Sequence, residues 1–459
     1  MKRPGLSCLA AALVTALLTC PPAAAISPPV VDPAVPPPDG APGPVVPMEQ
    51  HGECSVSGVI PGTDPGAATP DQLMLDLPAA WQFSRGEGQT VAILDTGVRP
   101  GPRLPTVDPG GDYVESTDGL TDCDGHGTLV AGLVAGQPGR DAFSGVAPAA
   151  RLLSIRVTSA KFSPRMAGGD PALRDASVEI AALGRAIVHA ADLGARVITV
   201  ATATCLPADR PVDQAALGAA IRYAAVVKDA VIVAAAGDNG GSVGSLGAGA
   251  GCESNPLADP SRPDDPRNWA GVTSVSIPAW WQPYVLSVAA LTPSGQPAKA
   301  TMSGPWVGVA APGEDVVSVS NGGDGSLANG LPNQRQRLVP LTGTGYAAGY
   351  VAGVAALVRG RYPGLTATQV VDRITATAHN AARTPSNLVG AGTLDPVAAL
   401  TWELPAHTPS APPAKQITPP PAPAPKSHLP QIVAFAGTGA LALVVAAAVF
   451  AYRRKEPFA

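Results

Sequence analysis

Short apolar runs that alternate with longer helical patterns constrain the fold of this chain more than any other feature of its sequence. Each run is brief, rich in β-branched residues and bounded by turn or polar residues, which is typical of strands buried on both faces. Between the last three runs, residues 175–193 and 213–227 place apolar side chains at helical spacing. The order strand, helix, strand, helix, strand predicts an α/β fold, with a mostly parallel sheet and helices on both faces. The runs are 91–94, 152–157, 197–200 and 231–234.

Proline is concentrated in two segments outside this predicted α/β domain. The chain has 459 residues with 51 glycines and 52 prolines. Together the two types make about 22% of the chain, which is below the level of a low-complexity polymer. Nine prolines lie in residues 26–48, and residues 405–430 are again rich in proline. We therefore predict a proline-rich N-terminal arm at 26–69, one large domain at 70–403 and a semi-rigid linker at 404–430.

The two ends of the chain have the patterns of targeting segments. A basic start, an apolar run and the small residues at 23–25 predict a cleaved signal peptide at 1–25. Near the C-terminus, the uncharged stretch 432–452 is long enough, at about 1.5 Å per residue, to cross a hydrocarbon core. We therefore assign 431–452 as a transmembrane helix. The basic residues that open the tail at 453–459 predict a single-pass protein of the cell membrane, with a cytoplasmic C-terminus and an extracytoplasmic large domain.

The cysteines agree with an extracytoplasmic domain. Cleavage of the signal peptide would leave an even number of cysteines in an oxidising compartment, so we expect two disulfides. Four cysteines allow three pairings, among which the sequence does not choose. The four residues are Cys54, Cys123, Cys205 and Cys252.

Two classes of partner are disfavoured by the composition. The net charge is −5, and no long run of Lys or Arg is present, which argues against nucleic acid. Zinc is the competing interpretation of the cysteines, but no Cys-x-x-Cys pair exists. Asp122 and Asp124, near His126, could suggest a metal, but they bracket Cys123 in a loop and lack a full set of ligands. We expect neither a metal nor a cofactor.

Three segments carry side chains with catalytic potential. Asp95 follows the first buried run in an Asp-Thr-Gly motif, which alone is weak evidence, because it also occurs as a structural turn or as half of an aspartic protease dyad. No second Asp in a similar context supports the dyad. His126 lies between two glycines at the start of a predicted buried helix, and residues 343–358 are a glycine turn that opens a second such helix. Chemistry in sheets of this kind occurs at the carboxyl ends of the strands, where we expect these segments to meet.

Together, the three segments resemble the subtilisin-type serine proteases over about residues 75–400. The order Asp, His and nucleophile helix is the order of that family, and residues 144–148 and 234–237 match it as well. The two ends, the cysteines and the segment 302–313 resemble the mycosins in particular, the membrane-anchored subtilases of actinobacterial type VII secretion systems. The resemblance implies a subtilisin-like fold, association with a type VII secretion membrane complex, and peptides or secreted proteins as substrates.

The resemblance also exposes two departures from the family pattern. It implies that Asp95 orients the imidazole and that His126 is the general base. The family's third segment reads Gly-Thr-Ser-x-Ala-Ala-Pro, however, and this chain has Gly345 at the nucleophile position. Losing the serine costs on the order of 10⁶ in rate in subtilisin. Asp238 stands where the family has its oxyanion asparagine, and a carboxylate repels a developing oxyanion. Some kexin-like relatives work with Asp there, so this second change alone is not disabling.

No other hydroxyl group is a good substitute. Thr344 is one residue away, which at a helix start turns its side chain by about 100° from His126. Ser303 lies in a segment that the mycosins have in addition to their own nucleophile. We therefore predict a mycosin-like pseudoprotease with a structural or peptide-binding role, in which Asp95 and His126 are an inherited hydrogen-bonded pair. The alternative is an active subtilisin-type endopeptidase that processes secreted substrates.

Overall fold

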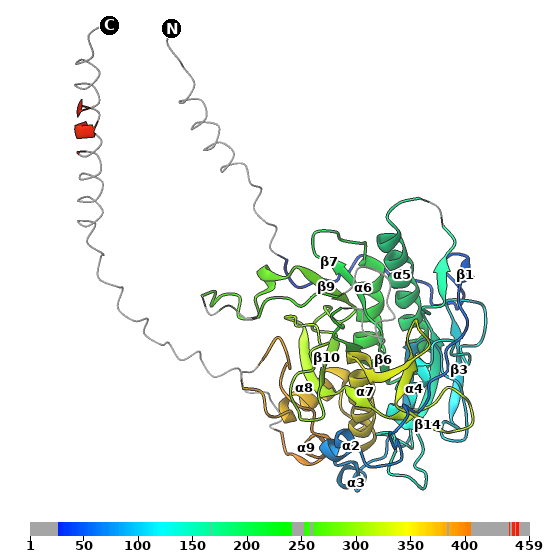
Figure 1. Ribbon diagram of the computed structural model, residues 1–459. Coiled ribbons are helices and arrows are strands. Elements are labelled where there is room, and N and C mark those ends of the chain that lie inside the picture. The colour runs from blue at the N-terminus through cyan, green and yellow to red at the C-terminus, as the bar shows by residue number, and fades with distance from the viewer. Residues whose placement is uncertain are drawn as a thin grey trace. The chain divides into compact units, whose positions relative to one another are not determined.

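The computed structural model divides the chain into two compact units, Met1–Trp402 and Glu403–Ala459 (Figure 1). The predicted signal peptide, most of the linker and most of the predicted transmembrane helix lie outside the described residues. Within the part of the chain that the structure does describe, no helix is long and apolar enough to cross a membrane. The described residues are 26–404 without 167, 241–251, 258, 260 and 383–384, together with 440, 443–445 and 447–448.

A seven-stranded sheet lies at the centre of the first unit, and all its strand pairs are parallel. The α/β prediction is thus confirmed, and the four runs singled out in the sequence are four adjacent strands. Three strands were not predicted, and one of them, β3, contains a Pro-Gly-Gly sequence that is atypical of strands. In spatial order the strands are β11 (Val307–Pro312), β10 (Val285–Leu291), β8 (Val231–Ala235), β6 (Val197–Val200), β2 (Thr90–Asp95), β4 (Arg151–Arg156) and β3 (Val107–Asp112).

Helices cover both faces of the sheet because successive strand residues point to opposite faces. In β2, Val91 and Ile93 belong to one core cluster, whereas Ala92 and Leu94 belong to the other. The first cluster includes α4 and α7, and the second includes α5 and α6. These helices are α4 (His126–Ala135), α5 (Pro171–Asp192), α6 (Ala215–Arg222) and α7 (Thr344–Arg361).

Shorter elements surround the sheet. The predicted helix at 213–227 is α6 followed by a π-helix at Tyr223–Val227. The remaining helices are α2 (Pro70–Leu75), α3 (Leu77–Ala80), the 3₁₀ turn Trp269–Gly271, α8 (Ala367–Thr377) and α9 (Pro396–Thr401). The remaining strands are β1 (Met48–Gln50), β5 (Phe162–Pro164), β7 (Thr204–Pro207), β9 (Ser274–Ile277), β12 (Glu314–Val316), β13 (Ser318–Val319), β14 (Leu327–Ala328), β15 (Gly330–Pro332) and β16 (Leu338–Thr342).

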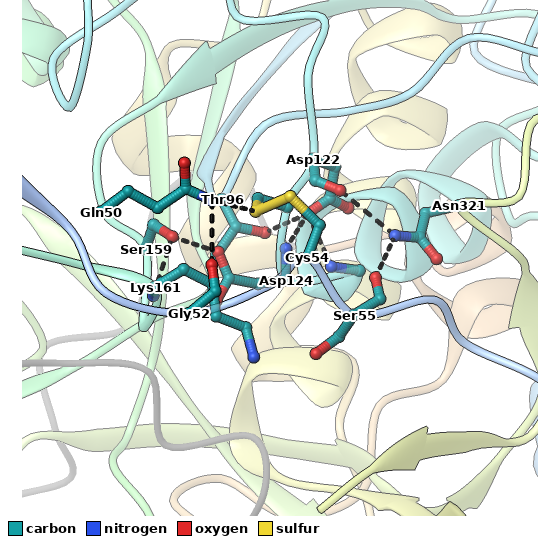
Figure 2. The surroundings of a disulfide bond; sticks show 12 residues. Gln50, Gly52, Cys54, Ser55, Thr96, Asp122, Asp124, Ser159, Lys161 and Asn321 are labelled. Atoms are coloured by element: carbon teal, nitrogen blue, oxygen red, sulfur yellow. Dashed lines mark hydrogen bonds between the residues drawn. A yellow bond between two sulfur atoms is a disulfide. The ribbon is translucent and has the colours of Figure 1, made fainter. Parts of the chain in front are cut away.

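The N-terminal arm is joined to the α/β body by pairing, hydrogen bonds and a disulfide. Strand β1 pairs antiparallel with β5, and Tyr113 donates a hydrogen bond to the carbonyl of Gly40. Of the three pairings that the sequence left open, the structure has Cys54–Cys123 and Cys205–Cys252. The first disulfide ties the arm to the loop that precedes α4 (Figure 2).

Candidate active site

Asp95 ends strand β2, His126 begins helix α4, and their side chains are in direct contact. Oδ1 of Asp95 lies 2.8 Å from Nδ1 of His126, and the two residues are 0% and 1% exposed. Burial acts to lower the pKa of His126. The hydrogen bond and charge of Asp95, together with the charges of Asp122 and Asp238, outweigh that effect and raise the pKa above its ordinary value. The structure thus brings together the two side chains that the sequence paired.

Asp122 holds the N-terminus of α4 in place. The N-cap of this helix is Gly125, which offers no side-chain acceptor. Instead, Asp122 Oδ2 accepts from the backbone N–H and hydroxyl of Thr128, and its Oδ1 accepts from the hydroxyl of Thr96. The backbone carbonyl of Asp122 accepts from Asn321, as Figure 2 shows. Since the bond from Thr128 satisfies a backbone N–H group that a helix start leaves unpaired, Asp122 is a capping residue. From the sequence, Asp122 was weighed only as a candidate metal ligand.

Asp124, the other acid beside Cys123, is also engaged. Its carboxylate accepts from the hydroxyl of Ser159 at 2.6 Å and from the backbone N–H of Ala160 at 3.0 Å (Figure 2). Burial raises its pKa above the ordinary range. Among the described residues, no group of three His, Cys, Asp or Glu side chains is arranged to hold a metal ion.

Gly345 lies in the first turn of α7 and faces His126. A Cβ atom at residue 345 would lie 3.1 Å from Nε2 and 3.0 Å from Cε1 of His126. The same atom would lie only 2.2 Å from the carbonyl oxygen of Ala201, closer than real Cβ contacts allow. Nε2 of His126 is buried and has no hydrogen-bond partner within the described part of the chain. Residue 345 therefore places no side chain against Nε2 of His126, and an added Cβ would require the Ala201 carbonyl or the first turn of α7 to move.

Tyr346 packs against the imidazole. The ring centroids of Tyr346 and His126 are 4.9 Å apart, and Tyr346 is 1% exposed. Burial, assisted by the negative charges of Asp95, Asp238 and Asp122, raises the pKa of the tyrosine hydroxyl well above its ordinary value. Tyr346 therefore packs against His126 as an uncharged phenol, a contact that the sequence did not predict.

Asp238 follows β8 and caps helix α7. Its Oδ1 accepts from the backbone N–H of Thr344 at 2.8 Å. The N-cap residue Gly343 has no side-chain acceptor of its own, so the carboxylate satisfies an N–H group at the positive end of the helix. Burial raises the pKa of Asp238 to about 6. At the oxyanion position predicted from the sequence, this residue thus accepts a hydrogen bond from the helix.

Comparison with known proteins gives the family. Residues 86–392 match the model of the subtilase family. Mycosin-3 of Mycobacterium tuberculosis (strain ATCC 25618 / H37Rv) is 71% identical, and the match covers 100% of both chains. The chain belongs to the mycosin family. Mycosin-1 of Mycolicibacterium smegmatis (strain ATCC 700084 / mc(2)155) is 44% identical over 97% of this mycosin and 98% of that relative.

Solved mycosin structures share the fold. The MycP3 protease from the type VII (ESX-3) secretion system is 65% identical with a TM-score of 0.79, covering 82% of this chain and 100% of that one. A chain of the intact ESX-5 inner membrane complex is 45% identical with a TM-score of 0.79, and the match covers 94% of this chain and 100% of that one. The subtilisin-like α/β fold that the resemblance implied is therefore confirmed.

The polar side chains near positions 345 and 238 form hydrogen bonds with other groups of this mycosin. The Thr344 hydroxyl accepts from the backbone N–H of Gly237 at 3.2 Å, and the Ser303 hydroxyl donates to the carbonyl of Asn255 at 2.5 Å. The amide of Asn239, the residue after Asp238, donates to the Ser254 hydroxyl and the Thr301 carbonyl. None of these groups is hydrogen-bonded to His126.

Proposed function

We propose that this mycosin serves a type VII secretion system as a pseudoprotease, in a structural or peptide-binding role. The observation that carries the proposal is Gly345, which faces an imidazole without offering it a hydroxyl. General-base catalysis by His126 requires a proton donor that becomes the nucleophile, and the described site provides none. Asp95 and His126 then act as a buried pair that joins strand β2 to helix α4.

The relatives support a partner and a location for this chain. A chain of the intact ESX-5 inner membrane complex and one of its periplasmic assembly resemble this chain at 45% and 46% identity. We infer that this mycosin likewise associates with the membrane complex of a type VII secretion system. Its large domain lies on the extracytoplasmic side of the cell membrane, and residues 431–452 anchor it as a single helix.

An active endopeptidase is the second candidate. The solved relatives MycP3 and MycP1 are described as proteases, and the Asp95–His126 hydrogen bond is the one that a working triad needs. This candidate predicts that the chain hydrolyses peptides and that His126→Ala abolishes the hydrolysis. It also requires a hydroxyl that reaches Nε2 after a rearrangement of the site.

Replacement of His126 in the native secretion system distinguishes the two candidates. A strain that lacks the native gene is complemented with wild type or His126→Ala, and the amount of purified membrane complex and of secreted protein is measured. The pseudoprotease proposal predicts equal complex and equal secretion, provided that the variant accumulates to the wild-type level. Full accumulation with lost secretion and lost processing of a secreted protein would instead establish the endopeptidase.

A further inference from the structure

Asp71 is a buried carboxylic acid outside the candidate active site. It lies in the first turn of α2 and is 1% exposed. Neither of its carboxyl oxygens has a hydrogen-bond partner within the described residues. Burying an ionised carboxylate without a partner is costly, so a group in this position favours its protonated form.

The charges around Asp71 act in the same direction as burial. The negative charges of Glu314 and Asp315 in β12 both disfavour the ionised form of Asp71. From α7, the group that interacts with Asp71 is Tyr350, which is buried and whose own pKa is raised well above the ordinary value. Burial first, and then the charges of Asp315 and Glu314, raise the pKa of Asp71 to about 7.

Helix α2 depends on this buried face for its position. It has six residues, and an isolated helix of that length is unstable in water. Thr69 caps it, with its hydroxyl accepting from the backbone N–H of Gln72. Its buried residues are Asp71 and Leu75, whereas Leu73 is 71% exposed. The contact of α2 with the domain therefore combines two apolar side chains, Leu75 and the partly buried Met74, with one carboxyl group.

We propose that Asp71 is a proton-dependent latch, which holds α2 and the adjoining end of the N-terminal arm against the α/β domain. A protonated Asp71 tolerates burial beside Glu314 and Asp315. An ionised Asp71 is repelled by both and gains hydration when α2 moves outward. Proton loss thus weakens the docking of a segment that connects the arm to the α/β domain.

The sign of the pH dependence follows from the raised pKa. Below the ordinary value of 3.8, Asp71 is protonated whether α2 is docked or detached, and docking is strongest. Between 3.8 and about 7, the detached form loses its proton while the docked form keeps it, so docking weakens as the pH rises. Above about 7 both forms are ionised, and docking stays weak.

Amide hydrogen exchange of the full chain tests the latch. Exchange in residues 70–76 is measured at pH 5.0 and pH 7.5 and corrected for the intrinsic rate at each pH. We expect protection in the wild type to be at least tenfold lower at pH 7.5. Asp71→Asn, which stays neutral, keeps the same protection at both values. Asp76→Asn is the matched control, because Asp76 ends the same helix but is exposed, and this variant retains the wild-type drop.

Two results would overturn the latch. One is equal corrected protection of the wild type at both pH values, and the other is an undiminished drop in Asp71→Asn. Should Asp71→Asn fail to fold, Asp315→Asn provides the second test. Removing one negative neighbour lowers the pKa of Asp71, so the pH at which protection is lost must move downward, and an unmoved or raised transition contradicts the proposal.

Discussion

At the scale of single residues, the absence of a side chain at position 345 has two separate consequences. Under the proposed pseudoprotease function, Gly345 offers no atom to attack a carbonyl; its missing Cβ also permits the Ala201 carbonyl to approach the first turn of α7. A working site needs a nucleophile within hydrogen-bond reach of His126 and space for it to move. The second consequence means that restoring a hydroxyl at residue 345 would also require the backbone near Ala201 to move.

Gly345→Ser is therefore expected to leave the protein inactive and less stable. Its Cβ would lie 2.2 Å from the Ala201 oxygen, so the backbone must shift. Overpacking of this kind costs about 1–3 kcal/mol. Urea unfolding measures the free energy of unfolding, and a fluorogenic peptide assay measures activity.

Gly349→Ala on the same helix is the matched control for that variant. Its nearest neighbour, the Cγ1 atom of Val130, would lie 3.3 Å from the added Cβ, and alanine favours the helix by about 1 kcal/mol. We expect its stability to stay within about 1 kcal/mol of wild type. A Gly345→Ser protein as stable as wild type, with restored hydrolysis, would show that the site had kept its working geometry.

At the scale of elements, the carboxylate of Asp238 is a cap that helix α7 receives from another segment. Asp238→Ala removes the acceptor of the Thr344 N–H, and loss of a cap lowers stability by about 0.5–2 kcal/mol. Asp238→Asn retains an acceptor oxygen and should lose less. Urea unfolding at pH 7 ranks the variants, and equal stability of the alanine and asparagine proteins would rule out the capping role.

Four strands of the sheet, the starts of α4 and α7 and the Asp95–His126 pair were predictable, but the packing around Gly345 was not. The runs at 91–94 and 197–200 are dense in β-branched residues, and both became strands of the parallel sheet. Strand β3 was missed because Pro109 and two glycines are atypical of a strand interior. The approach of the Ala201 carbonyl to Gly345 depends on how two elements pack, which sequence periodicity does not encode.

At the scale of the whole molecule, buried titratable groups predict a stability that falls as the pH rises. Burial raises the pKa of both Asp122 and Asp238 to about 6, so each contributes stability that is lost between its ordinary value of 3.8 and about 6. His126 has a raised pKa as well, so its contribution is present below 6.5 and is lost as the pH rises through the folded-state value. All three act in the same direction.

Urea unfolding at pH 5.0 and pH 7.5 measures this dependence. We expect the free energy of unfolding to be lower at pH 7.5, by on the order of 1 kcal/mol for each of the two acids, because about one pKa unit of each shift lies above pH 5.0. The acids with lowered pKa, such as Asp170 and Asp192, change their contribution below their ordinary value of 3.8, so they do not alter the trend between pH 5.0 and pH 7.5. Asp238→Asn should reduce the pH dependence. A stability that increases from pH 5.0 to pH 7.5 would contradict the assignment of these buried groups.

The central claim, that the chain has no nucleophile for His126 to activate, is tested most directly with a fluorophosphonate probe. The purified full chain is treated with the probe, with subtilisin as the positive control, and the intact mass of each protein is measured. We predict a mass increase for subtilisin and none for this mycosin. A covalent adduct on this chain that disappears in His126→Ala would contradict the claim.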